Sequence, residues 1–383
     1  MVNHGEEHLL NGAMVVLFRM LYDQIPRNYA PVSVTRDVYN FKSISGELNT
    51  MPILDKYFYA YKWRNRLSNY RTALESGNCK IVVIGDSITE GYWGSLRYVN
   101  GYPAVLRALL QAKHGDMGNG YINPREERIT YTGTWIQSDA SIFMYRKIAT
   151  DGATATITTP PSTSITVIYD EESDGGIFTV SIDGIVHEIY SSGDYRGRRF
   201  TVNNLSNSAH TVIITAPTTG KIYFGGLILE RSDSGILLHH IGHSGYAPID
   251  LINSSNAEEQ FRMCIDDFTP DLIIIAWGDN ENERSATEFK ADVNAFVSRA
   301  LTFGDVVLFC ESHMSYTTRN SKLYEIVDDN ADNVALVDTQ KALHDPIANG
   351  WWSGGSPGTV GSDPHPSNAG HDRSARVLYG ILN

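Results

Sequence analysis

The 383-residue sequence predicts an α/β protein, a doubly wound and mainly parallel sheet, with an all-β sandwich inserted into it. Two observations predict this fold class. Short, continuous apolar runs alternate with helical patterns in the second half of the chain, as buried parallel strands and their connecting helices do. The stretch 118–231 breaks that rhythm, because it is rich in Thr, Ser, Ile and Val and shows no helical pattern.

Four segments follow one another along the chain. In the N-terminal segment, 1–54, four apolar residues recur at helical spacing: Leu10, Met14, Leu17 and Leu21. An irregular stretch that contains Pro and Asn follows them. This helix either docks on the body of the protein or joins copies of the chain into a homo-oligomer, and docking is the simpler expectation. Residues 55–117 and 232–383 form the two parts of the α/β domain, and residues 118–231 form the insertion.

The α/β domain begins with an amphipathic helix over 55–75, which Ser76, Gly77 and Asn78 end. A buried strand over 80–84 comes next. We predict further strands of the same kind at 236–241, 272–277, 306–310 and 334–337. Between the last three of these strands, helical patterns lie at 286–301 and 321–329. Strands that alternate with helices in this way form a parallel sheet.

The insertion contains segments in which apolar and polar residues alternate, as they do in antiparallel strands. These segments lie at 164–169, 177–182, 201–202, 211–214 and 221–229. Asp183-Gly184 stands between two of them and indicates a tight hairpin. We expect a β-sandwich of a kind that is often found in glycan-active proteins, where it would bind carbohydrate.

Charge and hydropathy exclude two classes of partner. The net charge is −13, and the densest basic stretch is only Arg196–Arg199, so nucleic-acid binding is not expected. The apolar run Leu9–Tyr22 is short and interrupted by polar residues, so we expect no membrane span. The same run lacks the features of a secretion signal, and we therefore expect the chain to fold in the cytoplasm.

Neither a metal nor a cofactor is expected. Three cysteines lie far apart and form no CxxC pair: Cys79, Cys264 and Cys310. Several histidines lie near one another or near the C-terminal block described below: His239, His240, His243 and His371. Adjacent strand residues point to opposite faces, so His239 and His240 cannot both reach one metal ion. The glycine-rich motifs that bind dinucleotides and phosphates are absent.

The most informative motif is Gly85-Asp86-Ser87, which directly follows the strand at 80–84 and precedes a helix-forming stretch. A serine at the carboxyl end of a parallel strand lies at the sheet edge where α/β proteins bind their ligands. The N-terminus of the following helix can direct backbone N–H groups at an anion. Taken alone, Ser87 is equally well explained as a helix cap, so the functional interpretation depends on the rest of the chain.

Three further blocks stand at matching positions. Gly242-His243-Ser244-Gly245 follows the second predicted strand, Gly278-Asp279-Asn280-Glu281 follows the third, and Asp363-Pro364-His365 lies near the C-terminus. In this order the four blocks resemble those of the SGNH (GDSL-like) hydrolase superfamily, over roughly 80–117 and 232–383. The resemblance implies a flavodoxin-like α/β fold and serine hydrolase activity.

The resemblance also implies a role for each block. Ser87 would be the nucleophile and His365 its general base, because a serine hydroxyl needs a base to take its proton. The backbone N–H groups of Ser87 and Gly245 and the side-chain amide of Asn280 would form the oxyanion hole. An asparagine suits this role because its amide donates a hydrogen bond without introducing charge.

Two blocks depart from the family pattern. Glu281 stands where the family usually has Asp, at a supporting position. Asp363 lies two residues before His365, whereas Ser362 occupies the family's usual carboxylate position. Either a local kink lets Asp363 orient the imidazole, or a backbone carbonyl does so and Ser87 and His365 act as a dyad. We predict the triad, because an imidazole that must become charged commonly has a carboxylate beside it.

Three tryptophans bear on the substrate. Trp351 and Trp352 lie in a glycine-rich loop before His365, and Trp93 follows the nucleophile closely. Aromatic faces near a cleft often stack on sugar rings, although for Trp93 core packing is the simpler expectation. Together with the insertion, these residues favour an esterase that removes O-acyl groups, most simply O-acetyl groups, from a polysaccharide or other glycan.

Two other functions stay open. The same residues would serve a hydrolase of small esters, thioesters or lysophospholipids. Alternatively, the chain is a catalytically weak glycan-binding module of a tail or adhesin. An N-terminal helical segment combined with a β insertion resembles the layout of phage tail-spike esterases, which would reconcile folding in the cytoplasm with a virion-associated or extracellular site of action.

Overall fold

The structure is a computed structural model that describes residues 29–35, 38–43, 59–63, 66–92, 94–138, 144–278, 280–281, 284–310, 317–330, 333–342 and 365–383. The chain forms two compact units, 1–54 and 55–383. In the first unit, β1 (Tyr29–Thr35) pairs with β2 (Val38–Ser43) in an antiparallel hairpin. Irregular chain was predicted here from the sequence, and that prediction was wrong. Alternating Val, Tyr and Phe side chains favour strands, and the ladder accommodates Pro31 at a register shift. The expected helix over 10–21 lies outside the described residues.

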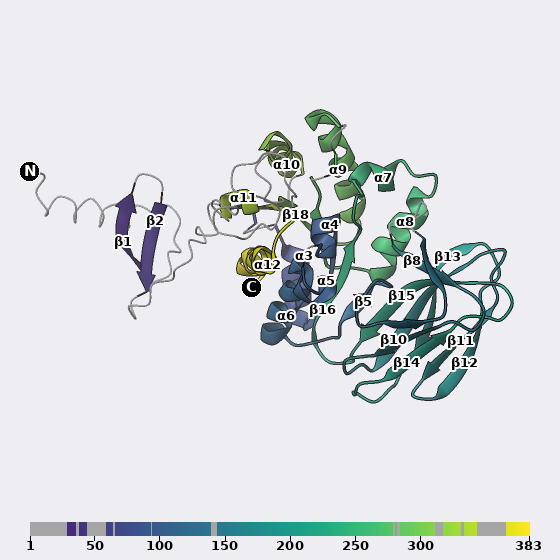
Figure 1. Cartoon of the computed structure of the whole chain (residues 1–383). Helices are drawn as coiled ribbons and strands as arrows, with labels where there is room; N and C mark the ends of the chain where they lie inside the picture. The colour runs from purple at the N-terminus through teal and green to yellow at the C-terminus, as the bar shows by residue number, and fades with distance from the viewer. Residues whose placement is uncertain are drawn as a thin grey trace, which may run out of the picture. The chain divides into compact units, whose positions relative to one another are not determined.

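The second unit contains a six-stranded sheet of order β16-β4-β17-β18-β19-β3 (Figure 1). Its first five strands are parallel and coincide with the predicted apolar runs: β16 (Gly235–Gly242), β4 (Asn78–Gly85), β17 (Leu272–Ala276), β18 (Asp305–Cys310) and β19 (Val334–Asp338). Gly242 and Ala276 both lie in register with Gly85. The chain therefore leaves β16, β4 and β17 side by side at one edge of the sheet.

The helix expected over 55–75 is shorter than predicted. The structure places β3 (Ala60–Tyr61) antiparallel to β19 and begins α3 (Ser68–Ser76) well after it. The predicted end of the helix is right, because Gly77 caps it in the left-handed conformation at φ +72°. The correction has a tertiary cause: the segment before α3 pairs with the edge of the sheet, which periodicity alone does not reveal.

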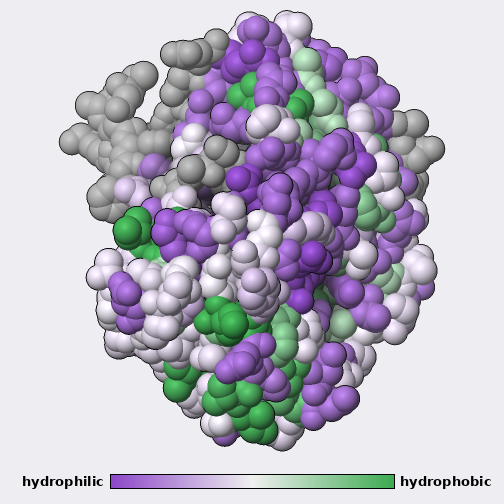
Figure 2. Space-filling view, turned by 90° about the vertical axis from the view of Figure 1, so that its right-hand side faces the viewer, coloured by the Kyte–Doolittle hydropathy of each residue, from purple (hydrophilic) through white to green (hydrophobic). Residues whose placement is uncertain are grey.

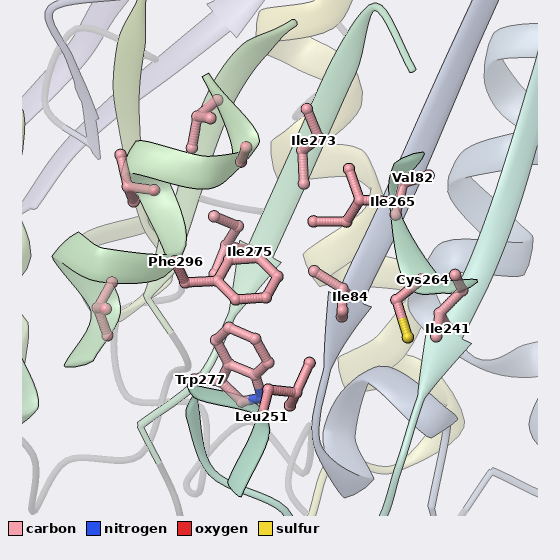
Figure 3. Close-up of a cluster of buried hydrophobic side chains, with 14 of the residues drawn as sticks. Val82, Ile84, Ile241, Leu251, Cys264, Ile265, Ile273, Ile275, Trp277 and Phe296 are labelled. Carbon is pink, nitrogen blue, oxygen red and sulfur yellow. The ribbon is translucent and has the colours of Figure 1, made fainter. Parts of the chain in front are cut away.

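Helices cover both faces of the parallel sheet. One face packs against α8 (Ala257–Cys264), α9 (Ala286–Ala300) and α10 (Thr317–Asp329) through a core that includes Ile84, Ile275, Trp277 and Phe296 (Figure 3). On the other face, the Tyr102 ring of α6 (Tyr102–His114) lies 5.0 Å from that of Phe309. The other helices in the part of the chain that the structure describes are α4 (Ser87–Glu90), α5 (Arg97–Asn100), α7 (Pro248–Ile252), the 3-10 turn Asp266–Phe268, α11 (Thr339–Ala342) and α12 (Asn368–Leu382).

Between β4 and β16, residues 118–231 form two antiparallel sheets. The first has the order β13-β10-β15-β8-β7, with β5 also on β15: β13 (Tyr195–Val202), β10 (Ser164–Glu171), β15 (Ile222–Glu230), β8 (Arg146–Ala149), β7 (Trp135–Ser138) and β5 (Gly120–Ile122). The second has the order β12-β11-β14-β9-β6: β12 (Ile185–Tyr190), β11 (Ile177–Ile182), β14 (Thr211–Thr215), β9 (Thr154–Thr158) and β6 (Thr130–Thr132).

The two antiparallel sheets share one apolar core, to which Val167 and Leu229 of the first sheet and Val180 and Ile214 of the second contribute. The predicted hairpin between β11 and β12 is confirmed, with Asp183 at φ +51° and Gly184 at φ +87°. The mixed α/β fold with additional antiparallel sheets, predicted from the sequence, is thus confirmed.

The surface carries apolar side chains that are concentrated on the antiparallel sheets. Most of the exposed large hydrophobic residues among those described belong to this region: Ile136, Ile177, Ile185, Val186, Tyr190 and Tyr195. Figure 2 shows hydrophobic side chains gathered at the lower end of the face it presents, the end at which these sheets lie in Figure 1. Among the helices that the structure describes, none combines the length and apolarity needed to cross a lipid bilayer.

Candidate active site

Ser87 is the first residue of α4, directly after the turn that ends β4. Asp86 caps this helix, because its Oδ1 accepts a hydrogen bond from the N–H of Ile88 at 2.9 Å. Gly85 is required by close packing, since a Cβ there would lie 2.2 Å from both the Ala276 carbonyl oxygen and the Thr89 Oγ1. The capping role that competed for Ser87 therefore belongs to its neighbour, and the Ser87 hydroxyl is left for other chemistry.

His365 lies against Ser87, although 278 residues separate them in sequence. The distance between His365 Nε2 and Ser87 Oγ is 2.7 Å, which is a hydrogen bond. The Tyr92 ring packs on the imidazole with 4.5 Å between centroids. The Arg97 guanidinium lies 4.6 Å from the centre of the same Tyr92 ring. The structure thus brings together a serine hydroxyl and a base in the arrangement that nucleophilic catalysis requires.

The chain that carries His365 is anchored just beyond it. Ser367 caps α12 by accepting a hydrogen bond from the N–H of Gly370 at 3.3 Å. His371, one turn further on, accepts from the Tyr102 N–H through Nδ1, and its Nε2 faces the Tyr92 carbonyl oxygen at 3.2 Å. Burial lowers the pKa of His371 to about 4, so this imidazole is neutral and serves to position its neighbours.

The two predicted oxyanion blocks meet beside β4. The His243 N–H donates to the Gly85 carbonyl at 3.0 Å, which joins the glycine block to the turn before Ser87. Gly245 has a φ of +83°. The Asn280 side-chain amide donates to the Tyr246 carbonyl at 3.0 Å, so the third block lies next to the second. One N–H of that amide is engaged in this bond, and the other can serve a substrate oxyanion.

Glu90, three residues after Ser87, lies in the same cluster and was not predicted from the sequence. Its carboxylate is fully buried and accepts hydrogen bonds from Ser244 of the glycine block and from Tyr145 of the insertion. Arg97 and Arg125 form ion pairs with the same carboxylate. The sequence carries no signal for this role, because the partners of Glu90 are distant along the chain and its burial is known only from the structure.

The other clustered histidines have structural roles. His239 packs on Phe268 with 4.2 Å between ring centroids, whereas His240 hydrogen-bonds to the Thr89 carbonyl and lies against Tyr98. The two side chains thus lie on opposite faces of β16. Burial lowers the pKa of His240 to about 4, so it is neutral. In the part of the chain that the structure describes, no three His, Cys, Asp or Glu side chains converge to hold a metal ion.

Four predicted site residues lie outside the described residues: Asp363, Trp93, Trp351 and Trp352. The choice between a triad and a dyad therefore stays a prediction, as does sugar stacking on the tryptophans. Glu281 is described, and it forms an ion pair with Arg319 at 3.8 Å. Arg319 also donates to the Gly278 carbonyl at 2.8 Å, so the residue that departs from the family pattern helps to anchor the third block.

Comparison with known proteins adds evidence on the fold. A solved structure of a peptidoglycan O-acetylesterase matches with a TM-score of 0.62 at 16% identity, covering 82% of this chain and 94% of that one. The chain has the fold of that esterase. The SGNH-type resemblance inferred from the four blocks is thereby confirmed for the fold.

Other similar structures carry less weight. Family two carbohydrate esterases from Clostridium thermocellum and Cellvibrio japonicus each match with a TM-score of only 0.29, at 14% and 15% identity, over 66% and 68% of this chain and 97% of each of theirs. These scores are too low to support an argument. No family model matches the sequence, and no curated protein matches it.

Proposed function

We propose that the protein is a serine esterase that hydrolyses O-acyl esters, most simply O-acetyl esters, on a glycan. The observation that carries the proposal is the 2.7 Å hydrogen bond between His365 Nε2 and Ser87 Oγ at the carboxyl edge of a parallel sheet. This edge is where α/β proteins carry out their chemistry. The fold match to a peptidoglycan O-acetylesterase supports the choice of an acylated glycan as substrate.

The proposed reaction has two stages. As Ser87 Oγ attacks the ester carbonyl carbon, His365 Nε2 takes the hydroxyl proton and the carbonyl oxygen becomes an oxyanion. Collapse of this intermediate breaks the bond to the sugar oxygen, which leaves with the proton from His365. Water then attacks the acyl-enzyme, His365 takes the proton of the water, and Ser87 recovers it as the carboxylic acid departs. The N–H groups of Ser87 and Gly245 and the Asn280 amide stabilise the oxyanion in both stages.

The same geometry bears on two alternative functions. A hydrolase of small esters, thioesters or lysophospholipids would use the same pair, and only the substrate distinguishes it. A catalytically weak glycan-binding module is disfavoured by the hydrogen bond between Ser87 and His365. We further propose that the insertion binds carbohydrate, that residues 1–54 dock or join copies of the chain, and that the enzyme acts on extracellular or virion-associated glycans.

Acetate release from a panel of substrates tests the proposal. The panel contains acetyl and longer nitrophenyl esters, acetylated xylan, acetylated alginate, O-acetylated sialic acid, peptidoglycan and bacterial capsule fractions. Ser87→Ala should abolish release without unfolding the protein, because it removes one hydroxyl. Ser298→Ala, on the exposed face of α9, is the matched control and should keep full activity. A folded Ser87→Ala variant with the activity of the control would refute the serine mechanism. Activity on nitrophenyl esters alone would favour the small-ester alternative.

A further inference from the structure

We propose that Glu90 is a positioning residue that fixes the Ser244-Gly245 turn for oxyanion binding, and that Arg125 and Tyr145 from the insertion complete this support. On this account residues 118–231 are part of the catalytic centre as well as a separate set of sheets. The proposal rests on the proposed function, since it assigns a task within that reaction. It concerns a residue that is not expected to touch the substrate itself.

One oxygen of the Glu90 carboxylate holds the glycine block. Glu90 Oε2 accepts a hydrogen bond from the Ser244 N–H at 3.0 Å and a second from the Ser244 hydroxyl. The Tyr145 hydroxyl donates to the same oxygen at 3.0 Å and itself accepts from the Ser244 N–H at 3.2 Å. Ser244 is therefore held at both its backbone and its side chain. The peptide group that carries the Gly245 N–H is planar and begins at the Ser244 carbonyl, so with Ser244 held that N–H can turn only about the Ser244 Cα–C bond.

The other oxygen faces the positive charges. Glu90 Oε1 accepts from Arg97 at 2.8 Å and lies 3.0 Å from a nitrogen of Arg125, while the Tyr98 hydroxyl donates to it at 3.3 Å. Burial would raise the pKa of Glu90, but the Arg125 guanidinium, the Ser244 hydrogen bond and Arg97 outweigh it, and the pKa falls below its usual value. Glu90 is therefore ionised, as its acceptor-only role requires.

The two arginines also remove an electrostatic conflict. A lone buried carboxylate beneath the oxyanion site would oppose the negative charge that forms there. Two guanidiniums against one carboxylate leave the cluster with a net positive charge, so the anchor does not act against the oxyanion. Burial, with the charge of Glu90 as the next cause, raises the pKa of both Tyr98 and Tyr145, so both phenols stay protonated as donors.

The insertion supplies two of these groups. Arg125 precedes β6, and Tyr145 immediately precedes β8. The Arg125 guanidinium lies 4.5 Å from the centre of the Tyr145 ring, and that ring contacts His243 of the glycine block with 3.9 Å between centroids. The insertion and the glycine block are thus joined through Tyr145 at the site itself, and the antiparallel sheets stabilise a turn that carries a proposed oxyanion donor.

Glu90→Gln tests the positioning role at nearly constant volume. A glutamine must turn its amino group toward either Ser244 or the arginines, where only acceptors are suitable, so the turn should loosen. Complete loss of an oxyanion donor costs about 100- to 1,000-fold in kcat. We expect a partial loss, a roughly 10- to 100-fold fall in kcat with KM changed far less. Tyr145→Phe should give a smaller fall of the same kind.

The matched control is Glu126→Gln. Like Glu90, Glu126 is a buried carboxylate that forms an ion pair with an arginine, here Arg128 at 2.8 Å. Unlike Glu90, it lies in the insertion. The control should keep its kcat, and all variants are compared after thermal unfolding has shown that they are folded. If Glu90→Gln does not fold, Tyr145→Phe and Ser244→Ala carry the test. Equal falls in kcat for Glu126→Gln and Glu90→Gln, or a change in KM alone, would overturn the proposal.

Amide hydrogen exchange separates this proposal from the proposed function, because it needs no substrate. Exchange in peptides that cover 242–247 should be faster in Glu90→Gln and in Tyr145→Phe than in the wild type and in Glu126→Gln. Unchanged exchange there would overturn the positioning role even if the protein is an esterase. If Ser87→Ala keeps full activity, the serine mechanism fails, and faster exchange would still show that Glu90 holds the turn.

Discussion

In the parallel sheet, buried polar side chains gather where β4 and β16 end, at Asp86, Ser87, Glu90 and His243. In the antiparallel sheets, buried polar side chains pair with other side chains of the same region. Arg146 of β8 and Asp170 of β10 form a two-pronged ion pair at 2.6 and 2.8 Å, and His210 bonds to Asp183 at the β11–β12 turn at 2.6 Å.

The difference separates chemistry from stability. Polar groups at the carboxyl edge of the parallel sheet include a hydroxyl and an imidazole whose hydrogen bond is suited to catalysis. Polar groups in the antiparallel sheets satisfy each other and hold strands and a turn in place. The two regions meet at Glu90, which accepts hydrogen bonds from the N–H and the hydroxyl of Ser244 and from the hydroxyl of Tyr145. Substitutions in the first region should therefore change turnover, and substitutions in the second should change stability.

The largest effect is expected from His365→Ala. Without the imidazole, no base takes the Ser87 proton, and kcat should fall on the order of 10⁴-fold or more, with the unfolding temperature nearly unchanged. Steady-state kinetics on a nitrophenyl acetate, beside thermal unfolding, measure both quantities. A loss of stability large enough to explain the loss of activity would place His365 among the structural residues and break the comparison.

Asp363→Asn distinguishes the triad from the dyad. If Asp363 orients His365, an amide supplies the wrong hydrogen-bond pattern, and kcat should fall on the order of 1,000-fold. If a backbone carbonyl orients it, the fall should be about tenfold or less. We expect the larger value, measured as kcat under saturating substrate. A mild effect, with His365→Ala still inactive, would leave Ser87 and His365 as a dyad.

Asp170→Asn should act on stability. Arg146 would keep a buried charge without its carboxylate, which typically costs about 3–5 kcal/mol in the free energy of unfolding. Denaturant unfolding measures this cost, and turnover at a temperature where the variant is folded should stay close to that of the wild type. A variant with unchanged stability and reduced turnover would show that this ion pair belongs to the catalytic region.

The smallest effect, and the one with a pH signature, is expected from Asp183→Asn. Asparagine tolerates the positive φ of this turn position, so the substitution removes mainly the charge. Burial acts to lower the pKa of His210, but its hydrogen bonds, first the one to Asp183, together outweigh burial and the pKa rises. The same hydrogen bond between the two side chains lowers the pKa of Asp183. The pair therefore stabilises the folded state fully between pH 3.8 and pH 6.5, the pKa values of Asp183 and His210 in the unfolded chain. This contribution is lost as the pH rises through the raised pKa of His210.

Thermal unfolding at two pH values measures that contribution. The unfolding temperature of Asp183→Asn should lie below that of the wild type at pH 5, and the gap should narrow at pH 8. Turnover should be unchanged at both. A gap that widens with pH would mean that the bond does not depend on a charged imidazole.

Much of this account could be predicted from the sequence. Strands β4, β16, β17, β18 and β19 were recognisable because buried parallel strands are continuous apolar runs. Ser87 was recognisable because its block directly follows such a strand, and His365 because its block comes last in the order of the four. The late start of α3 was missed, because pairing of β3 with β19 overrides local periodicity. Glu90 was missed because its partners Ser244 and Tyr145 lie 154 and 55 residues away, and only the fold brings them together.

Covalent labelling of the nucleophile tests the central claim most directly. A fluorophosphonate reacts with a serine hydroxyl that a neighbouring base activates, and leaves a stable adduct that peptide mass spectrometry can locate. The account predicts one rapid adduct, on the peptide that contains Ser87, which is lost in Ser87→Ala and strongly slowed in His365→Ala. Rapid labelling at another residue, or labelling at an undiminished rate in the folded Ser87→Ala variant, would contradict it.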